Sequence, residues 1–148
     1  MAIHQSIKNL DLIKEELKFN NNKLPSIIAV SKTFPISNIM PLINHGHIHF
    51  GENKVQEALD KWLSIKDKFN QVQLHMIGKL QTNKVKNALT IFDFIHSLDS
   101  EKLAQKLSKE QINCQNKPKI FIQVNIGSES QKSGIDKKEL NDFYSYCK

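Results

Sequence analysis

An alternation of short apolar runs with amphipathic segments is the feature that most limits the fold of this chain. Five runs rich in Ile, Val, Leu and Phe have the length of β-strands, and each is followed by a segment with apolar residues at helical spacing. Strands that alternate with helices predict a parallel sheet with right-handed crossovers. The expected strands cover residues 26–31, 47–53, 71–78, 91–98 and 119–126, and the expected helices cover 5–19, 35–45, 53–69, 81–89, 99–111 and 136–147.

Two architectures contain this alternation, a doubly wound open sheet and a (β/α)8 barrel. A barrel needs roughly 250 residues, and at least about 200, whereas the chain has 148. Five of the eight strand–helix units of a barrel are recognisable, together with an N-terminal helix. The sequence therefore predicts an α/β protein that is either an open sheet or a partial barrel, in a single domain over residues 1–148.

The composition of the chain argues against a nucleic-acid or membrane partner. The formal net charge is +6, but all 21 basic residues are lysine, and arginine is the usual residue for bidentate contacts with phosphates and bases. No apolar run approaches the roughly 20 residues of a membrane helix, and the polar, amphipathic start does not resemble a signal peptide. We therefore expect a cytoplasmic protein with Cys114 and Cys147 as reduced thiols.

Polar residues recur at the carboxyl ends of the expected strands, where parallel α/β folds build their sites. They are Lys32, Asn53, His75 or Lys79, Ser97 and Asn125. Lys32 ends an apolar strand, and desolvation lowers the pKa of a lysine and frees its lone pair for Schiff-base chemistry. Pyridoxal phosphate is the commonest partner of such a lysine. No glycine-rich phosphate loop follows the first strand, which disfavours a mononucleotide site.

Three histidines, His45, His47 and His49, have the period-two spacing of paired metal ligands on a strand. Gly46 falls where a helix should end, so we expect His45 and His47 in a turn. No carboxylate cluster accompanies the histidines in the sequence. We therefore predict no metal site.

Five motifs, in order along the chain, resemble those of the pyridoxal phosphate homeostasis proteins, a single-domain group related to the N-terminal barrel of alanine racemase. The motifs are AVSKTFP (29–35), FGENKVQE (50–57), HMIGKLQTNK (75–84), IHSLDSEKLAQKL (95–107) and VNIGSESQKSG (124–134). The resemblance covers essentially the whole chain from residue 24 onward. It implies a partial (β/α)8 TIM barrel of fold-type III.

The resemblance also implies that Lys32 carries pyridoxal 5′-phosphate as a Schiff base. The protein would hold and deliver this cofactor in intracellular homeostasis, without established catalytic turnover. Asn53 and His75 would line the cofactor ring, and Asn83 and Ser97 are weaker candidates. For His75 the alternative is a hydrogen-bonded histidine of the barrel interior. A racemase-like activity is disfavoured, because the chain offers no second catalytic base such as a tyrosine from another domain.

The chain departs from the family pattern at three positions and in length. Lys54, Leu74 and Met76 stand where family members usually or often carry an aromatic residue. The family's phosphate-binding elements lie in later strands, so the resemblance implies a member truncated at its C-terminus. The alternative is a non-functional or split-gene fragment without pyridoxal phosphate binding of its own. Its partner would be a complementary C-terminal chain, or a second copy that associates through exposed strand edges.

Overall fold

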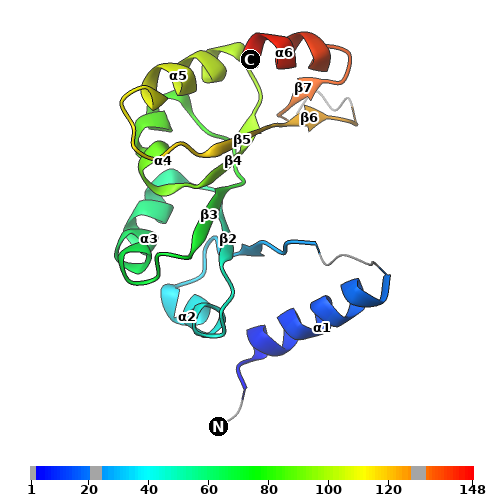
Figure 1. Ribbon diagram of the computed structural model, residues 1–148, viewed down its shortest axis with the longest axis vertical. Coiled ribbons are helices and arrows are strands. Elements are labelled where there is room, and N and C mark those ends of the chain that lie inside the picture. The colour runs from blue at the N-terminus through cyan, green and yellow to red at the C-terminus, as the bar shows by residue number, and fades with distance from the viewer. Residues whose placement is uncertain (1–2, 21–24, 128–132) are drawn as a thin grey trace.

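The computed structural model describes residues 3–20, 25–127 and 133–148, and its centre is a sheet of five parallel strands (Figure 1). The strands are β1 (Ala29–Val30), β2 (His49–Glu52), β3 (Gln73–Met76), β4 (Phe94–Leu98) and β5 (Lys119–Ile122). They lie side by side in the order of the sequence, and each pairs in parallel with the next. A doubly wound sheet reverses its strand order at a switch point, so the sequential order identifies a partial barrel, which is the one of the two expected architectures that the family resemblance implied.

The connecting helices cover one side of the sheet, where α3, α4 and α5 follow one another in Figure 1. The helices are α1 (Gln5–Asn20), α2 (Ile36–Asn44), α3 (Val55–Lys68), α4 (Val85–Ile91), α5 (Glu101–Gln111) and α6 (Leu140–Cys147), and the 3-10 turn η1 (Thr82–Lys84) precedes α4. Helix α2 begins after Pro35 and is followed by Gly46, whose φ of +87° favours glycine. Over the ranges described, no helix is both long enough and apolar enough to cross a membrane.

The hydrophobic core lies between the sheet and its connecting helices. Phe50, Leu74 and Ile95, from three neighbouring strands, are completely buried in this layer. Trp62 of α3 is also completely buried and packs on Phe50, with ring centroids 5.0 Å apart. Burial of a large apolar side chain contributes about 1.5–3 kcal/mol. The helix-covered side of the sheet is therefore the main source of stability.

The expected fifth strand, residues 119–126, divides at Gln123. Its first part is β5, and Gln123 N still donates to Leu98 O over 2.9 Å. Beyond Gln123 the backbone pairs differently, as β6 (Val124–Asn125) with the short strand β7 (Ile135–Asp136). Helix α6 then begins at Leu140 rather than at residue 136, because Lys138 N donates to the carboxylate of Asp136 in a turn before the helix (2.8 Å).

The side of the sheet away from the core, which we call the inner face, carries a row of three histidines. His49, His75 and His96 lie on β2, β3 and β4. Nδ1 of His49 is 3.0 Å from Nε2 of His75, and Nδ1 of His75 is 2.9 Å from Nε2 of His96. The ring of His75 stacks on Phe94 with centroids 4.3 Å apart. The two histidine contacts give the buried ring of His75 hydrogen-bonding partners within the sheet.

Gly78, directly after β3, lets the chain approach the end of β2 closely. A Cβ atom at this position would lie 2.4 Å from Asn53 O and 2.7 Å from Asn53 Cα. Both atoms belong to the backbone, so neither can move away as a flexible side chain would. Glycine is therefore required here for packing, and it fixes the loop after β3 against Asn53.

We predict that Gly78→Ala destabilises the protein by about 2–3 kcal/mol, the upper part of the range of about 1–3 kcal/mol that is usual for overpacking. Gly46→Ala is the matched control, because a Cβ there meets nothing within 4 Å and only the φ of +87° opposes alanine. The control should cost about 1 kcal/mol. Urea unfolding of both variants measures the difference. Equal destabilisation by the two substitutions would contradict the packing role of Gly78.

We also predict that stability falls as the pH decreases from about 6.5 to about 4. Burial, followed by the charges of His96 and His49, lowers the pKa of His75 to about 4, while Asp93 opposes the shift. In this pH range the unfolded chain binds more protons than the folded one, so acid favours unfolding by up to about 3 kcal/mol. The lowered pKa of Glu57 acts in a lower window, beneath its ordinary value of 4.5.

Urea unfolding measured at several pH values tests this prediction, with His75→Gln as the comparison. The variant should have a flatter dependence of unfolding free energy on pH over this window. Some slope should remain, because burial also lowers the pKa values of His47 and His96. An unchanged slope in the variant would show that His75 is not the titrating group.

Candidate functional site

Lys32 lies directly after β1, at the carboxyl-end edge of the sheet. Phe34 N donates to Ser31 O over 3.2 Å, so residues 31–34 form a β-turn. Lys32 is the second residue of this turn and Thr33 the third, with a φ of +66°. The side chain of Lys32 is exposed, so the turn presents the amine to solvent rather than to an apolar enclosure.

A buried hydrogen-bond network holds the beginning of the turn. Ser31 is 4% exposed, and its hydroxyl donates to Glu52 Oε1 over 2.8 Å. Lys61 Nζ donates to Ser31 O and to the same Glu52 oxygen, both over 2.9 Å. Trp62 Nε1 donates a further hydrogen bond to this oxygen, again over 2.9 Å. These three donors offset part of the cost of burying the Glu52 carboxylate, whose second oxygen, Oε2, is buried without a hydrogen-bond partner among the described residues.

Glu57, in the first turn of α3, holds the other end of the turn. Thr33 N donates to Glu57 Oε1 over 2.6 Å, and Lys61 Nζ donates to the same oxygen over 3.0 Å. The hydrogen bond from the Thr33 backbone is the largest effect that lowers the pKa of Glu57, and Lys61 adds to it, while desolvation opposes both. We call Ser31, Thr33, Glu52, Glu57 and Lys61 the turn network. It fixes the backbone on both sides of Lys32.

Asn53 directly follows β2, the strand next to β1. The register pairs Val30 with Gly51, and Lys32 and Asn53 each stand two residues beyond this pair, at the carboxyl ends of the two strands. Oδ1 of Asn53 is buried and has no hydrogen-bond partner among the residues that the structure describes. A buried polar atom without a partner costs about 1–3 kcal/mol. Asn53 is therefore suited to a hydrogen bond with a ligand beside Lys32.

His75 lies deeper on the inner face than Lys32 and Asn53. Its register partner on β2 is Gly51, two residues before Asn53, which corresponds to about 7 Å along a strand. Both ring nitrogens already contact other histidines. Because burial and the neighbouring histidines lower its pKa to about 4, the ring is neutral at pH 7. His75 thus lies in the same row across the sheet as Gly51 and Val30, nearer the middle of the strands than Lys32.

Asn83 and Ser97 lie further along the sheet from Lys32. Asn83 is exposed in η1 and lines a hollow of about 370 Å³ with residues of α5, among them Lys102 and Lys106. Ser97 is buried in β4, and its hydroxyl has no hydrogen-bond partner within the described ranges. Two strands separate β4 from β1. The structure thus places Asn53, rather than these two residues, at the end of the strand next to β1.

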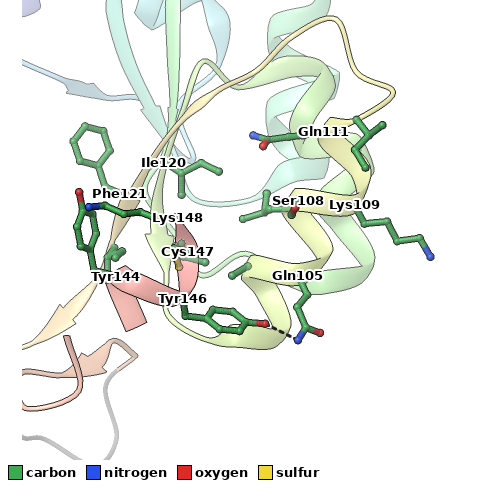
Figure 2. A pocket seen from close by; sticks show the side chains of 15 residues that line it. Gln105, Ser108, Lys109, Gln111, Ile120, Phe121, Tyr144, Tyr146, Cys147 and Lys148 are labelled. Atoms are coloured by element: carbon green, nitrogen blue, oxygen red, sulfur yellow. Dashed lines mark hydrogen bonds between the residues drawn. The ribbon is translucent and has the colours of Figure 1, made fainter. Parts of the chain in front are cut away.

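A cavity of about 880 Å³ lies at the opposite edge of the sheet, between α5, β5 and α6 (Figure 2). Its lining includes Ile120, Phe121 and Tyr144, and the hydroxyl of Tyr146 accepts a hydrogen bond from Gln105 across it (2.6 Å). Because β5 and β1 are at the two ends of the strand order, this cavity is separate from Lys32. The cavity is therefore not part of the candidate site around Lys32.

The histidines of the sequence HGHIH have separate partners. His45 Nε2 lies 3.5 Å from Asp11 of α1, and His47 Nε2 lies 2.9 Å from the backbone oxygen of His49. Among the residues described, no group of three or more His, Cys, Asp or Glu side chains is arranged to hold a metal ion.

The sequence analysis missed the charged members of the turn network. Glu57 and Lys61 have the i, i+4 spacing that places two side chains on one face of a helix, which was a usable signal. Glu52 was a second signal, because it is a charged residue in a strand whose neighbours are apolar. Their contacts with residues 31 and 33 could not be read from local patterns.

The chain is similar to several proteins of known sequence or structure. It is 34% identical over 138 residues to the "Pyridoxal phosphate homeostasis protein" of Haemophilus influenzae, with 89% of this chain and 58% of that protein covered. It is 37% identical over 120 residues to the protein of the same name from Aquifex aeolicus, with 81% and 52% covered. The chain therefore spans little more than half the length of these relatives.

Solved structures give the same result for the fold. The structure of PipY from Synechococcus elongatus without PLP matches with a TM-score of 0.81 and 33% identity, over 99% of this chain and 64% of that one. PipY with PLP bound matches with a TM-score of 0.70 and 36% identity, over 88% and 63%. These matches support the partial barrel that the strand order indicates.

A family assignment follows from the sequence profile of the family described as "Alanine racemase, N-terminal domain", which matches residues 7–148. This range includes all five strands of the sheet and the turn that carries Lys32. The chain therefore belongs to the alanine racemase N-terminal domain family.

Proposed function

We propose that this chain binds pyridoxal 5′-phosphate on Lys32 and takes part in intracellular homeostasis of that cofactor. The observation that carries the proposal is the exposed Lys32 amine on a turn that the turn network fixes at the carboxyl end of β1. The names of the relatives and the PLP-bound PipY support the choice of cofactor. We propose a cytoplasmic location, which suits the free thiols of Cys114 and Cys147.

Lys32 would hold the cofactor as a Schiff base. The neutral amine of Lys32 would add to the aldehyde carbon, and loss of one water molecule would leave a C=N bond in place of the C=O bond. The backbone around Lys32 is already ordered by its neighbours, so binding needs to order only the lysine side chain. We assign no catalytic residue, since holding and releasing the cofactor requires no turnover.

The residues beside Lys32 fit an aromatic cofactor with hydrogen-bonding groups. Asn53 offers a buried side-chain oxygen that lacks a partner among the described residues, and we propose that it contacts the cofactor ring. His75 would line the cofactor ring from the inner face of the sheet. The roles of Asn83 and Ser97 as cofactor ligands stay predictions.

The unpaired edges of the sheet favour a partner that supplies further barrel strands. In the described part of the chain, β1 and β5 each pair on one side only. Val30 and Phe121, on these two strands, are both 49% exposed. We propose that a complementary chain with the remaining strands, or a second copy, covers them. The same observation favours the alternative function, a fragment of a barrel domain that binds no pyridoxal phosphate until it is completed.

Titration of the protein with pyridoxal phosphate tests the proposed function. We expect the visible absorption band of a Schiff base, and we expect Lys32→Ala to abolish it. Lys8→Ala is the matched control, because this exposed lysine lies on α1, away from the turn. Reduction with borohydride followed by peptide mass analysis should locate the cofactor on Lys32. A band that persists in Lys32→Ala would refute the assignment, and no band in any variant would favour the fragment.

A further inference from the structure

We propose that Glu57 and Lys61 are positioning residues for Lys32, because they hold the turn at residues 31–34 in a backbone conformation that Thr33 disfavours. This inference rests on the proposed function of Lys32. It assigns to α3 a direct role in presenting the amine, through contacts with the backbone of the turn.

The conformation of Thr33 is the first step of the inference. Its φ of +66° makes it the one non-glycine residue in the left-handed region among those described. A positive φ at the third position is what a type II turn requires, and glycine or asparagine usually provides it. Threonine is branched at Cβ, so this conformation is strained and needs support from surrounding contacts.

Glu57 supplies that support from outside the turn. Its Oε1 accepts the Thr33 N–H over 2.6 Å, a short hydrogen bond to a charged acceptor. The N–H direction depends on the backbone angles of the turn, so the carboxylate favours the conformation in which the N–H points to α3. The side chain of Glu57 is only 26% exposed, which limits competition from water.

Lys61 joins this contact to the buried part of the network. Its ammonium donates three hydrogen bonds, to Ser31 O, Glu52 Oε1 and Glu57 Oε1, and its side chain is 10% exposed. An ammonium group has three donors, so all of them are used. One helix therefore holds the residue before Lys32 through its carbonyl and the residue after it through its N–H. The backbone on both sides of Lys32 is thus held in place, and its exposed side chain is accessible to a ligand.

Pyridoxal phosphate titration of Glu57 variants tests the positioning role. Glu57→Ala should weaken binding about tenfold, because the competent turn would be populated about one-tenth of the time without its support. Glu57→Gln keeps an oxygen acceptor and should bind nearly as well as the parent protein. Asp60→Ala is the matched control, since this exposed carboxylate on α3 contacts Gln56 of its own helix (2.9 Å) and should leave binding unchanged.

A rescue variant separates positioning from a general loss of structure. Glycine adopts a positive φ without strain, so Thr33→Gly should make the turn less dependent on Glu57. We expect Glu57→Ala to weaken binding by less than about threefold in the Thr33→Gly background, against about tenfold in the parent. An equally large effect in both backgrounds would overturn the inference.

The amide resonance of Thr33 gives a readout that does not depend on the cofactor. In the parent protein we expect the Thr33 amide proton to resonate far downfield and to exchange slowly. Glu57→Ala should remove both properties, and Asp60→Ala should preserve them. A Thr33 amide unaffected by Glu57→Ala would overturn the inference. If the parent protein shows no Lys32-dependent band, the proposed function fails instead, and the amide resonance still decides whether Glu57 holds the turn.

Discussion

The carboxylate of Glu52 is the contact on which the structure around Lys32 depends. One of its oxygens accepts hydrogen bonds from Ser31, Lys61 and Trp62, and the residue is completely buried. These donors come from the end of β1 and from α3, so the carboxylate joins two strands and a helix. Loss of one partner of a buried ion pair typically costs about 3–5 kcal/mol. The two strand ends and α3 are therefore expected to move as one unit.

The two sides of the sheet serve different purposes. The helix-covered side is closely packed and apolar, and it provides the stability. The inner face instead carries His49, His75 and His96, whose ring nitrogens contact one another. Aromatic rings continue this row, as His96 stacks on Phe121 with centroids 4.7 Å apart. This polar and aromatic surface is partly exposed, in contrast to the closely packed apolar side.

Much of the fold was predictable because the signals were local. Helical spacing of apolar residues and the glycine after α2 identified the elements, and the strand order confirmed the partial barrel. Strand lengths were less predictable. Residues 26–31 were expected in a strand, but only Ala29 and Val30 form one, because only these two residues pair with β2. Similarly, the last expected strand divides at Gln123, where Ile135 N donates to Gln123 O (2.8 Å).

The sequence by itself determined the order of the elements and the presence of a lysine after the first strand, since both follow from periodicity and short motifs. The tertiary structure alone decided how that lysine is held. The contacts of Glu52 with Ser31, of Glu57 with Thr33 and of Lys61 with Ser31 join residues that are 21, 24 and 30 positions apart. Such pairs meet only when β1, β2 and α3 pack together, and no local pattern encodes the distance between them.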